Sequence, residues 1–102
     1  MSASTETDED RRRRAIELLE ANHSFPCPFS ISVIARNDEA VASAIVAAVA
    51  EVGPIAEDGH ERRESGGGKY VSHRLVIHCG SPETVLALFA RVREIDGVIT
   101  VL

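Results

Sequence analysis

The chain has 102 residues, with 11 lysines and arginines against 16 aspartates and glutamates, which gives a formal net charge of −5. Hydrophobic residues make up 44% of the chain and aromatic residues only 4%, so we expect one globular domain with a mostly aliphatic core. This composition excludes wholesale disorder. The acidic balance argues against DNA as a partner, because a duplex-binding protein normally presents a basic face.

Signals for membranes and secretion are missing from the sequence. No apolar run approaches the roughly 18 residues of a membrane helix. The first residues have no basic start followed by an apolar stretch, so we expect a cytoplasmic protein with no membrane partner. Cys27 and Cys79 are too few for a disulfide scaffold, and we expect both to be reduced, small core residues.

Residues 1–24 are predicted to be a mobile charged tail followed by a short helix. Residues 1–8 are small, polar and acidic, which favours mobility. A helix is expected from about Asp10 to Asn22, because Asp10 precedes Arg14 by four residues in the favourable acid-first order. The run Arg11–Arg14 has acidic residues on both sides, so we interpret it as a solvated helix face rather than a nucleic-acid site.

Residues 25–54 predict a strand and then a helix. Apolar and polar residues alternate over 29–35, which indicates a half-buried strand. Asn37 is the expected N-cap of the following helix, and Asp38 and Glu39 suit the positive end of its dipole. The helix is expected to reach about Val52 and to end at Gly53-Pro54.

Residues 55–102 predict two more strands, a helix and a last strand. Residues 55–64 carry so many charges that only an exposed edge strand is possible there. Residues 65–68 form a glycine-rich turn, and residues 69–79 alternate as a long strand in which His73 shares the apolar face. Ser81-Pro82 opens a helix that ends near Gly97, and residues 98–102 form a short β-branched strand.

The predicted order after the leading helix is therefore β-α-β-β-α-β, over residues 25–102. Right-handed crossovers place both helices of this unit on one face of a four-stranded antiparallel sheet. The expected class is α+β, a ferredoxin-like sandwich with an additional N-terminal helix. The other face of the sheet is then either solvated or covered by a partner.

Three short motifs in this unit resemble those of the YbeD-like family of small bacterial proteins of unknown function. They are Phe25-Pro26-x-x-Phe29, Ser65-x-x-Gly68-x-Tyr70-x-Ser72 and Val98-x-x-Val101-Leu102. The resemblance implies a ferredoxin-like domain similar to the ACT regulatory domains that sense amino acids in biosynthetic enzymes. Family members usually carry a lysine in the first strand and a glycine at its end, where this chain has Ser32 and Ala35.

Candidate ligand- or partner-binding residues lie after the first strand, in the glycine-rich turn and along the outer face of the long strand. They are Arg36, Asn37, Ser65, Gly68, Tyr70, Ser72 and Arg74. We expect no catalytic residues, no metal site and no cofactor. The histidines and cysteines lack the spacing of metal ligands, and no nucleophile has a plausible base beside it.

Four functions remain open on this reading. The first is an interaction or regulatory module without catalysis, self-associating as a homodimer or binding a protein partner through the sheet face or edge. The alternative is an ACT-like sensor of a small, amino-acid-type molecule. Less favoured are an RNA-binding module, since the outer face offers only Tyr70 for stacking bases, and an acylphosphatase-like hydrolase using Arg36 and Asn37.

Overall fold

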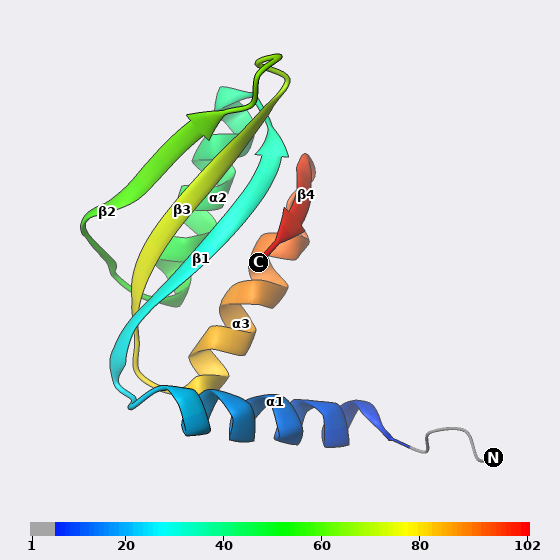
Figure 1. Ribbon diagram of the computed structural model, residues 1–102, viewed down its shortest axis with the longest axis vertical. Helices are drawn as coiled ribbons and strands as arrows, with labels where there is room; N and C mark the ends of the chain where they lie inside the picture. Colours follow the sequence, from blue (N-terminus) through cyan, green and yellow to red (C-terminus); the bar gives the residue numbers. More distant parts are fainter. Residues whose placement is uncertain (1–5) are drawn as a thin grey trace.

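The computed structural model of the protein describes residues 6–102 (Figure 1). Within this range the chain forms three helices and four strands. In chain order they are α1 (Asp8–Asn22), β1 (Cys27–Arg36), α2 (Glu39–Val52), β2 (Ile55–Glu64), β3 (Tyr70–Cys79), α3 (Pro82–Arg93) and β4 (Val98–Val101). The predicted α+β class with a four-stranded antiparallel sheet is confirmed.

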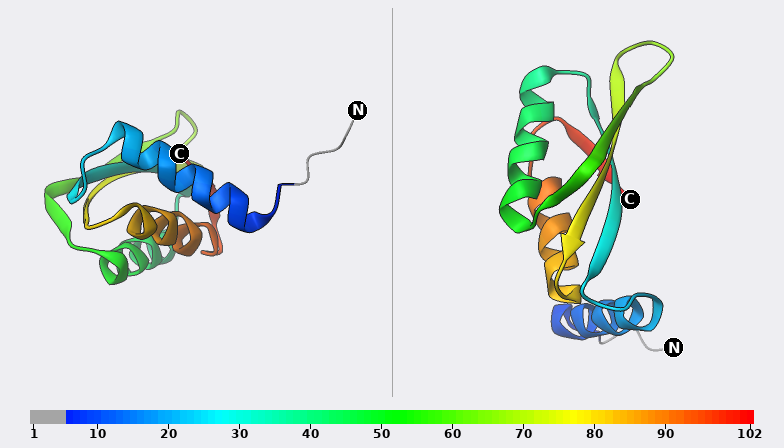
Figure 2. Two further views of the ribbon diagram at one scale, coloured as in Figure 1. Left: turned by 90° about the horizontal axis from the view of Figure 1, so that it is seen from below. Right: turned by 90° about the vertical axis from the view of Figure 1, so that its left-hand side faces the viewer.

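The sheet is one layer of the domain and has the strand order β2-β3-β1-β4. Its centre is the pair β1 and β3, which stay in register from Cys27 opposite Cys79 to Arg36 opposite Tyr70. Figure 2 shows α2 and α3 side by side on one face of this sheet. Among residues 6–102, no element covers the opposite face.

The core lies between the sheet and these two helices. Alternate residues of β1 and β3 point into it, as the pleat of a strand requires. Leu75, Ile45 and Leu88 have no exposed surface, and they come from β3, α2 and α3 respectively. The other fully covered side chains of the core include Ile31, Val33, Ala35, Val49, Ile77, Cys79, Val85 and Val92.

The start of α2 differs by one residue from the prediction. Its N-cap is Asp38, whose carboxylate accepts a hydrogen bond from the backbone N–H of Ala40 at 2.8 Å, and not Asn37. Both residue types cap helices well. Asn37 is instead held by the glycine-rich turn, to which its side chain and backbone both donate. The cap of α3 is Ser81, as predicted.

Helix α1 begins earlier than predicted, at Asp8. Thr7 is its N-cap, and Thr7 and Asp10 form a reciprocal capping box, which lowers the pKa of the Asp10 carboxyl through the hydrogen bond it accepts from the Thr7 backbone. Within the predicted mobile stretch, Thr7 caps the helix, Asp8 begins it and Glu6 pairs with Arg14, while residues 1–5 lie outside the described range. The helix buries none of its residues fully, although Leu19 packs against the core. None of the helices in residues 6–102 is long and apolar enough to cross a membrane.

Gly97, between α3 and β4, occupies a position that only glycine fits. Its φ of +99° is unfavourable for other residues, and a Cβ built there would lie 2.6 Å from Cγ2 of Val41. We predict that Gly97→Ala lowers the free energy of unfolding by at least about 1 kcal/mol, measured by urea denaturation. Gly80→Ala is the control, because nothing lies within 4 Å of the added carbon. Equal stabilities of the two variants would contradict this account of Gly97.

Candidate functional site

The face of the sheet that no helix covers, here called the open face, carries the candidate site. Its side chains on the two central strands alternate with the buried ones and are mostly exposed or half-buried. From β1 they are Ser30, Ser32 and Ile34, and from β3 they are Tyr70, Ser72, Arg74, Val76 and His78. Three of the predicted site residues, Tyr70, Ser72 and Arg74, thus share one surface.

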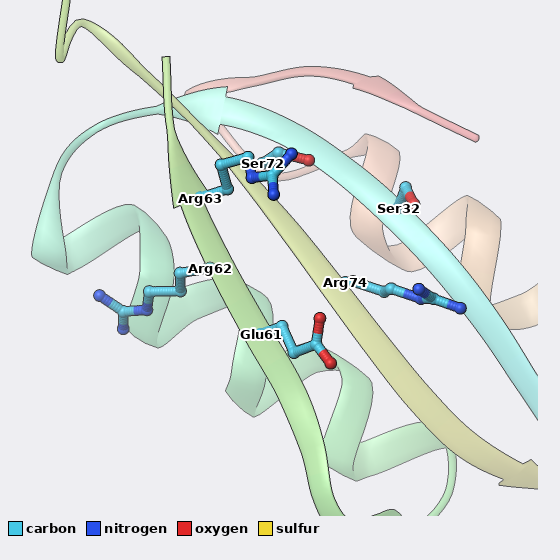
Figure 3. Close-up of a pocket in the computed structure, with 6 residues that line it drawn as sticks. All are labelled: Ser32, Glu61, Arg62, Arg63, Ser72 and Arg74. Carbon is cyan, nitrogen blue, oxygen red and sulfur yellow. The ribbon is translucent and has the colours of Figure 1, made fainter. Parts of the chain in front are cut away.

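A hollow of about 350 Å³ lies on this face over β2, β3 and β1, and we call it the arginine hollow (Figure 3). It is lined by Ser32, Glu61, Arg62, Arg63, Ser72 and Arg74. The register explains this gathering, because Arg63 lies opposite Ser72, and Glu61 lies opposite Arg74. Arg63, Arg74 and the two serines therefore line one hollow from three strands.

The two neighbouring arginines of β2 have opposite surroundings. Arg62 extends to the other side of the strand, towards α2, where its guanidinium pairs with the Glu39 carboxylate at 2.9 Å. This hydrogen bond lowers the pKa of Glu39 and raises that of Arg62. Arg63 remains on the open face, and within residues 6–102 it forms no ion pair and no side-chain hydrogen bond.

Arg74 also lacks an acidic partner within the described residues. The Nε of Arg74 donates a hydrogen bond to Ser30 Oγ at 3.2 Å, so its partner is a hydroxyl group and not a carboxylate. Glu61 faces the same hollow, yet it forms no ion pair with Arg74 although the two residues are cross-strand neighbours. The hollow consequently holds two cationic groups against one carboxylate, in a chain whose net charge is −5.

A second hollow of about 190 Å³ adjoins the first at the Tyr70 end of β3. Arg63 and Ser72 line both hollows, so the two hollows are neighbours. Ile34 and the Tyr70 side chain contribute apolar surface to the second one. The open face therefore offers a polar, cationic depression next to a less polar one.

The remaining predicted site residues lie at the end of the sheet, where their polar groups bind one another. Asn37 Nδ2 donates to the carbonyl oxygen of Gly68 at 2.8 Å, and its backbone N–H donates to that of Lys69. Ser65 Oγ accepts from the backbone N–H of Tyr70 at 3.3 Å. These bonds fasten the β1–α2 loop to the β2–β3 turn.

Arg36 does not join Asn37 in a common anion site. Its guanidinium lies 3.8 Å from the Asp38 carboxylate, while the Asn37 amide is directed at the β2–β3 turn. An acylphosphatase-like reaction needs an arginine and an asparagine that converge on one phosphate, and this arrangement does not favour it. For the stacking of RNA bases, the open face offers Tyr70, with Lys69 Nζ 5.8 Å from its ring, and the imidazole ring of His78.

On the opposite, helix-covered side, β2 and β3 are joined by a pair of histidines. His60 Nε2 and His73 Nδ1 are 3.0 Å apart, so one ring nitrogen donates to the other. His73 is only 1% exposed, and its Nε2 has no hydrogen-bond partner among the described residues. Burial lowers the pKa of both histidines, and the neighbouring Arg62 lowers both further. Glu39, which also faces His73, opposes this effect only weakly.

The comparison with protein families identifies the chain. Residues 20–102 match the family described as protein of unknown function (DUF493). The chain belongs to this family. The predicted resemblance to the YbeD-like family is confirmed, because DUF493 is that family. A comparison with curated proteins gives no significant match.

Two solved structures similar to this DUF493 chain confirm an ACT-like fold. The ACT domain from GTP pyrophosphokinase of Chlorobium tepidum superposes with a TM-score of 0.62 at 14% identity, covering 74% of this chain and 94% of that one. Protein HP0495 from H. pylori gives a TM-score of 0.63 at 17% identity, covering 79% of this chain and 86% of that one. At these identities the similarity establishes the fold alone.

Sequence reasoning missed Arg63 and Glu61 of this family member as open-face residues. Simple alternation from the inward-facing Ile55 would turn Arg63 inward. The register instead shifts between Ile55 and His60, where Asp58 has a φ of +58° and Gly59 is buried. This irregularity inverts the alternation, so His60 and Arg62 face α2 while Glu61 and Arg63 face outward. The glycine within the charged segment was the available signal for a bulge.

The buried histidines predict how stability depends on pH. Because the folded state disfavours their charged forms, it binds fewer protons than the unfolded chain, whose histidines titrate near pH 6.5. The free energy of unfolding should therefore fall as the pH is lowered below about 6.5, by up to about 1.4 kcal/mol per pH unit for the buried His73 and by less for the half-buried His60. Urea unfolding between pH 5 and pH 8 measures this slope.

Replacement of the buried ring identifies the source of that slope. His73→Leu replaces the buried ring by an apolar side chain that cannot bind a proton. The free energy of unfolding should then depend less on pH. His78→Gln, on the open face, is the matched control and should keep the slope of the parent protein. A slope that is the same in all three proteins would show that other groups govern the acid sensitivity.

Proposed function

We propose that this chain is a regulatory module without catalytic activity of its own, which acts by associating with a second copy of itself. Its membership of DUF493 brings no assigned reaction. Its fold resembles that of a domain found within a larger enzyme, the ACT domain of a GTP pyrophosphokinase. The strongest nucleophile of the core, Cys79, is fully buried, and burial raises the pKa of its thiol, which disfavours the reactive thiolate.

The observation that carries the proposal is the exposed apolar edge at β4. In the described residues, the large hydrophobic side chains that remain exposed are Leu18, Tyr70, Ile99 and Leu102. Two of these, Ile99 at 60% and Leu102 at 70%, belong to the last five residues, which carry no charged side chain. The register between β1 and β4 shifts at Ile34, and this places Ile99 outside the regular pairing.

The other edge of the sheet is protected against such contacts. Strand β2 carries six charged residues in its last eight positions, 57–64, and its pairing is interrupted before His60. Charges and bulges are the means by which natural proteins prevent edge-to-edge pairing. Two copies of the chain can meet at β4 without like-charge repulsion, and a two-fold axis there would pair each free edge with its equivalent.

The oligomeric state tests this proposal. We expect the full chain to be a dimer at micromolar concentrations by native mass spectrometry and by light scattering after size exclusion. Ile99→Lys should shift the mass to that of a monomer, because it places a charge in the apolar contact.

A matched control separates this effect from general changes of surface charge. Leu18→Lys makes the same substitution at a side chain of 59% exposure on α1, and it should leave the dimer intact. The proposal is rejected if the parent protein is a monomer up to about 100 μM, or if the two variants dissociate alike.

The alternative function, a sensor of a small molecule, is favoured by a separate observation, the two hollows of the open face. The predicted ligand position near Arg36, Asn37 and the Ser65–Tyr70 turn has its Asn37 and Ser65 side chains engaged in hydrogen bonds with the chain itself. A ligand would find free donors on the open face instead.

A further inference from the structure

The arginine hollow holds cationic groups that the protein itself leaves without counterions. Guanidinium groups on protein surfaces commonly pair with carboxylates, and this chain has an excess of acidic residues. Arg62, Arg91 and Arg36 each have a carboxylate within 4 Å. Arg63 and Arg74, which lie on the same side of the sheet and line one hollow, have none among the described residues.

Hydroxyl groups complete a set of donors around the hollow. Ser32 on β1 and Ser72 on β3 line it together with the two arginines, and neither serine side chain forms a hydrogen bond within residues 6–102. Figure 3 shows the Arg74 side chain leaving β3 on the side of β1, and the Arg63 side chain lying over Ser72, with the two guanidinium groups directed away from each other. Planar guanidinium forks supported by hydroxyl donors match the oxygens of a phosphate or a carboxylate.

The adjoining hollow indicates what the rest of such a ligand looks like. It begins at Arg63 and Ser72, so a ligand held by these residues extends directly into it. Its walls include Ile34 and Tyr70, and Tyr70 as a residue is 38% exposed. An apolar group of the ligand would cover this exposed surface and gain free energy by leaving water.

We propose that the open face binds a small molecule that carries an oxyanion, a phosphate or carboxylate, on an apolar body. Arg63 and Arg74, which are both exposed, turn towards the oxyanion and hold it, Ser32 and Ser72 donate to it, and the apolar body lies beside Tyr70. Glu61 faces the same hollow and weakens the binding of any anion. This inference goes beyond the proposed function, because the proposed dimer contact lies at the β4 edge and leaves the hollows open.

Isothermal titration of the full chain at low ionic strength tests the site with three probes: inorganic phosphate, phenyl phosphate and benzoate. Phenyl phosphate should bind more tightly than inorganic phosphate, because only the former has an apolar body. The comparison of phenyl phosphate with benzoate then distinguishes a phosphate site from a carboxylate site. If neither organic anion gives a saturable heat, the proposal is wrong.

Two neighbouring residues of β2 provide a matched pair of variants. Arg63→Gln should weaken the tighter organic probe at least tenfold, because it removes a charged donor from the hollow. Arg62→Gln removes the same charge from the adjacent position. Although Arg62 is among the residues that line the hollow, its guanidinium pairs with Glu39 on the other side of the sheet, so the affinity should change less than twofold. Equal losses in the two variants would show attraction to overall charge and would overturn the site.

Three further variants test the remaining parts of the site. Arg74→Gln should weaken binding as Arg63→Gln does. If the Arg74 variant fails to fold, the Arg63 variant is sufficient for the test, because Arg63 lies on an exposed edge strand. Glu61→Gln should strengthen the binding of every probe. Tyr70→Ala should reduce phenyl phosphate to the affinity of inorganic phosphate, and an unchanged preference would refute the apolar part of the site. Ligand binding is measured by heat and the dimer by mass. The two proposals can therefore fail separately.

Discussion

The antiparallel pairing of β1 with β3 determines which side chains of the two central strands lie on the open face and which lie in the core. The pairs run without interruption from Cys27 and Cys79 to Arg36 and Tyr70. A shift by one residue would expose Leu75 and bury the Arg74 guanidinium, and both changes cost free energy. Because the apolar side chains of β1 and β3 are buried on one face, the residues between them must lie on the other. The same register therefore places Ser32, Ser72 and Arg74 on the open face.

Strand β2 places charged and histidine side chains on both sides of the sheet. On the helix-covered side, Arg62 pairs with Glu39 and His60 joins His73, and these contacts attach the edge strand to the core and to α2. On the open side, Arg63 is left without a counterion in the described residues and completes the arginine hollow. The charges that protect this edge from self-pairing therefore also supply a binding group. The apolar edge at β4 remains available for association, and the two proposed contacts do not compete.

Features that depend on residues close together in the sequence could be predicted from it, and features that depend on contacts between distant residues could not. The alternation of β1 and β3 and the Ser81 cap depend on near neighbours, and the sequence was sufficient for them. The choice of Asp38 over Asn37 as a helix cap depends on hydrogen bonds to a turn about 30 residues away. The orientation of Arg63 and the contact between His60 and His73 depend on the irregularity before His60, which inverts the alternation of β2. Such an inversion changes every later residue of a strand, and no count of periods along the sequence reveals it.

We propose that this family member binds its ligand on the open face and not in the loops at the end of the sheet. Mapping of backbone amide shifts in the full chain by nuclear magnetic resonance, during titration with phenyl phosphate, tests it most directly. The account predicts saturable shifts at Ser32, Arg63, Ser72 and Arg74, with little change in the β1–α2 loop. Shifts centred on Arg36, Asn37 and Gly68, with the open face unchanged, would contradict it.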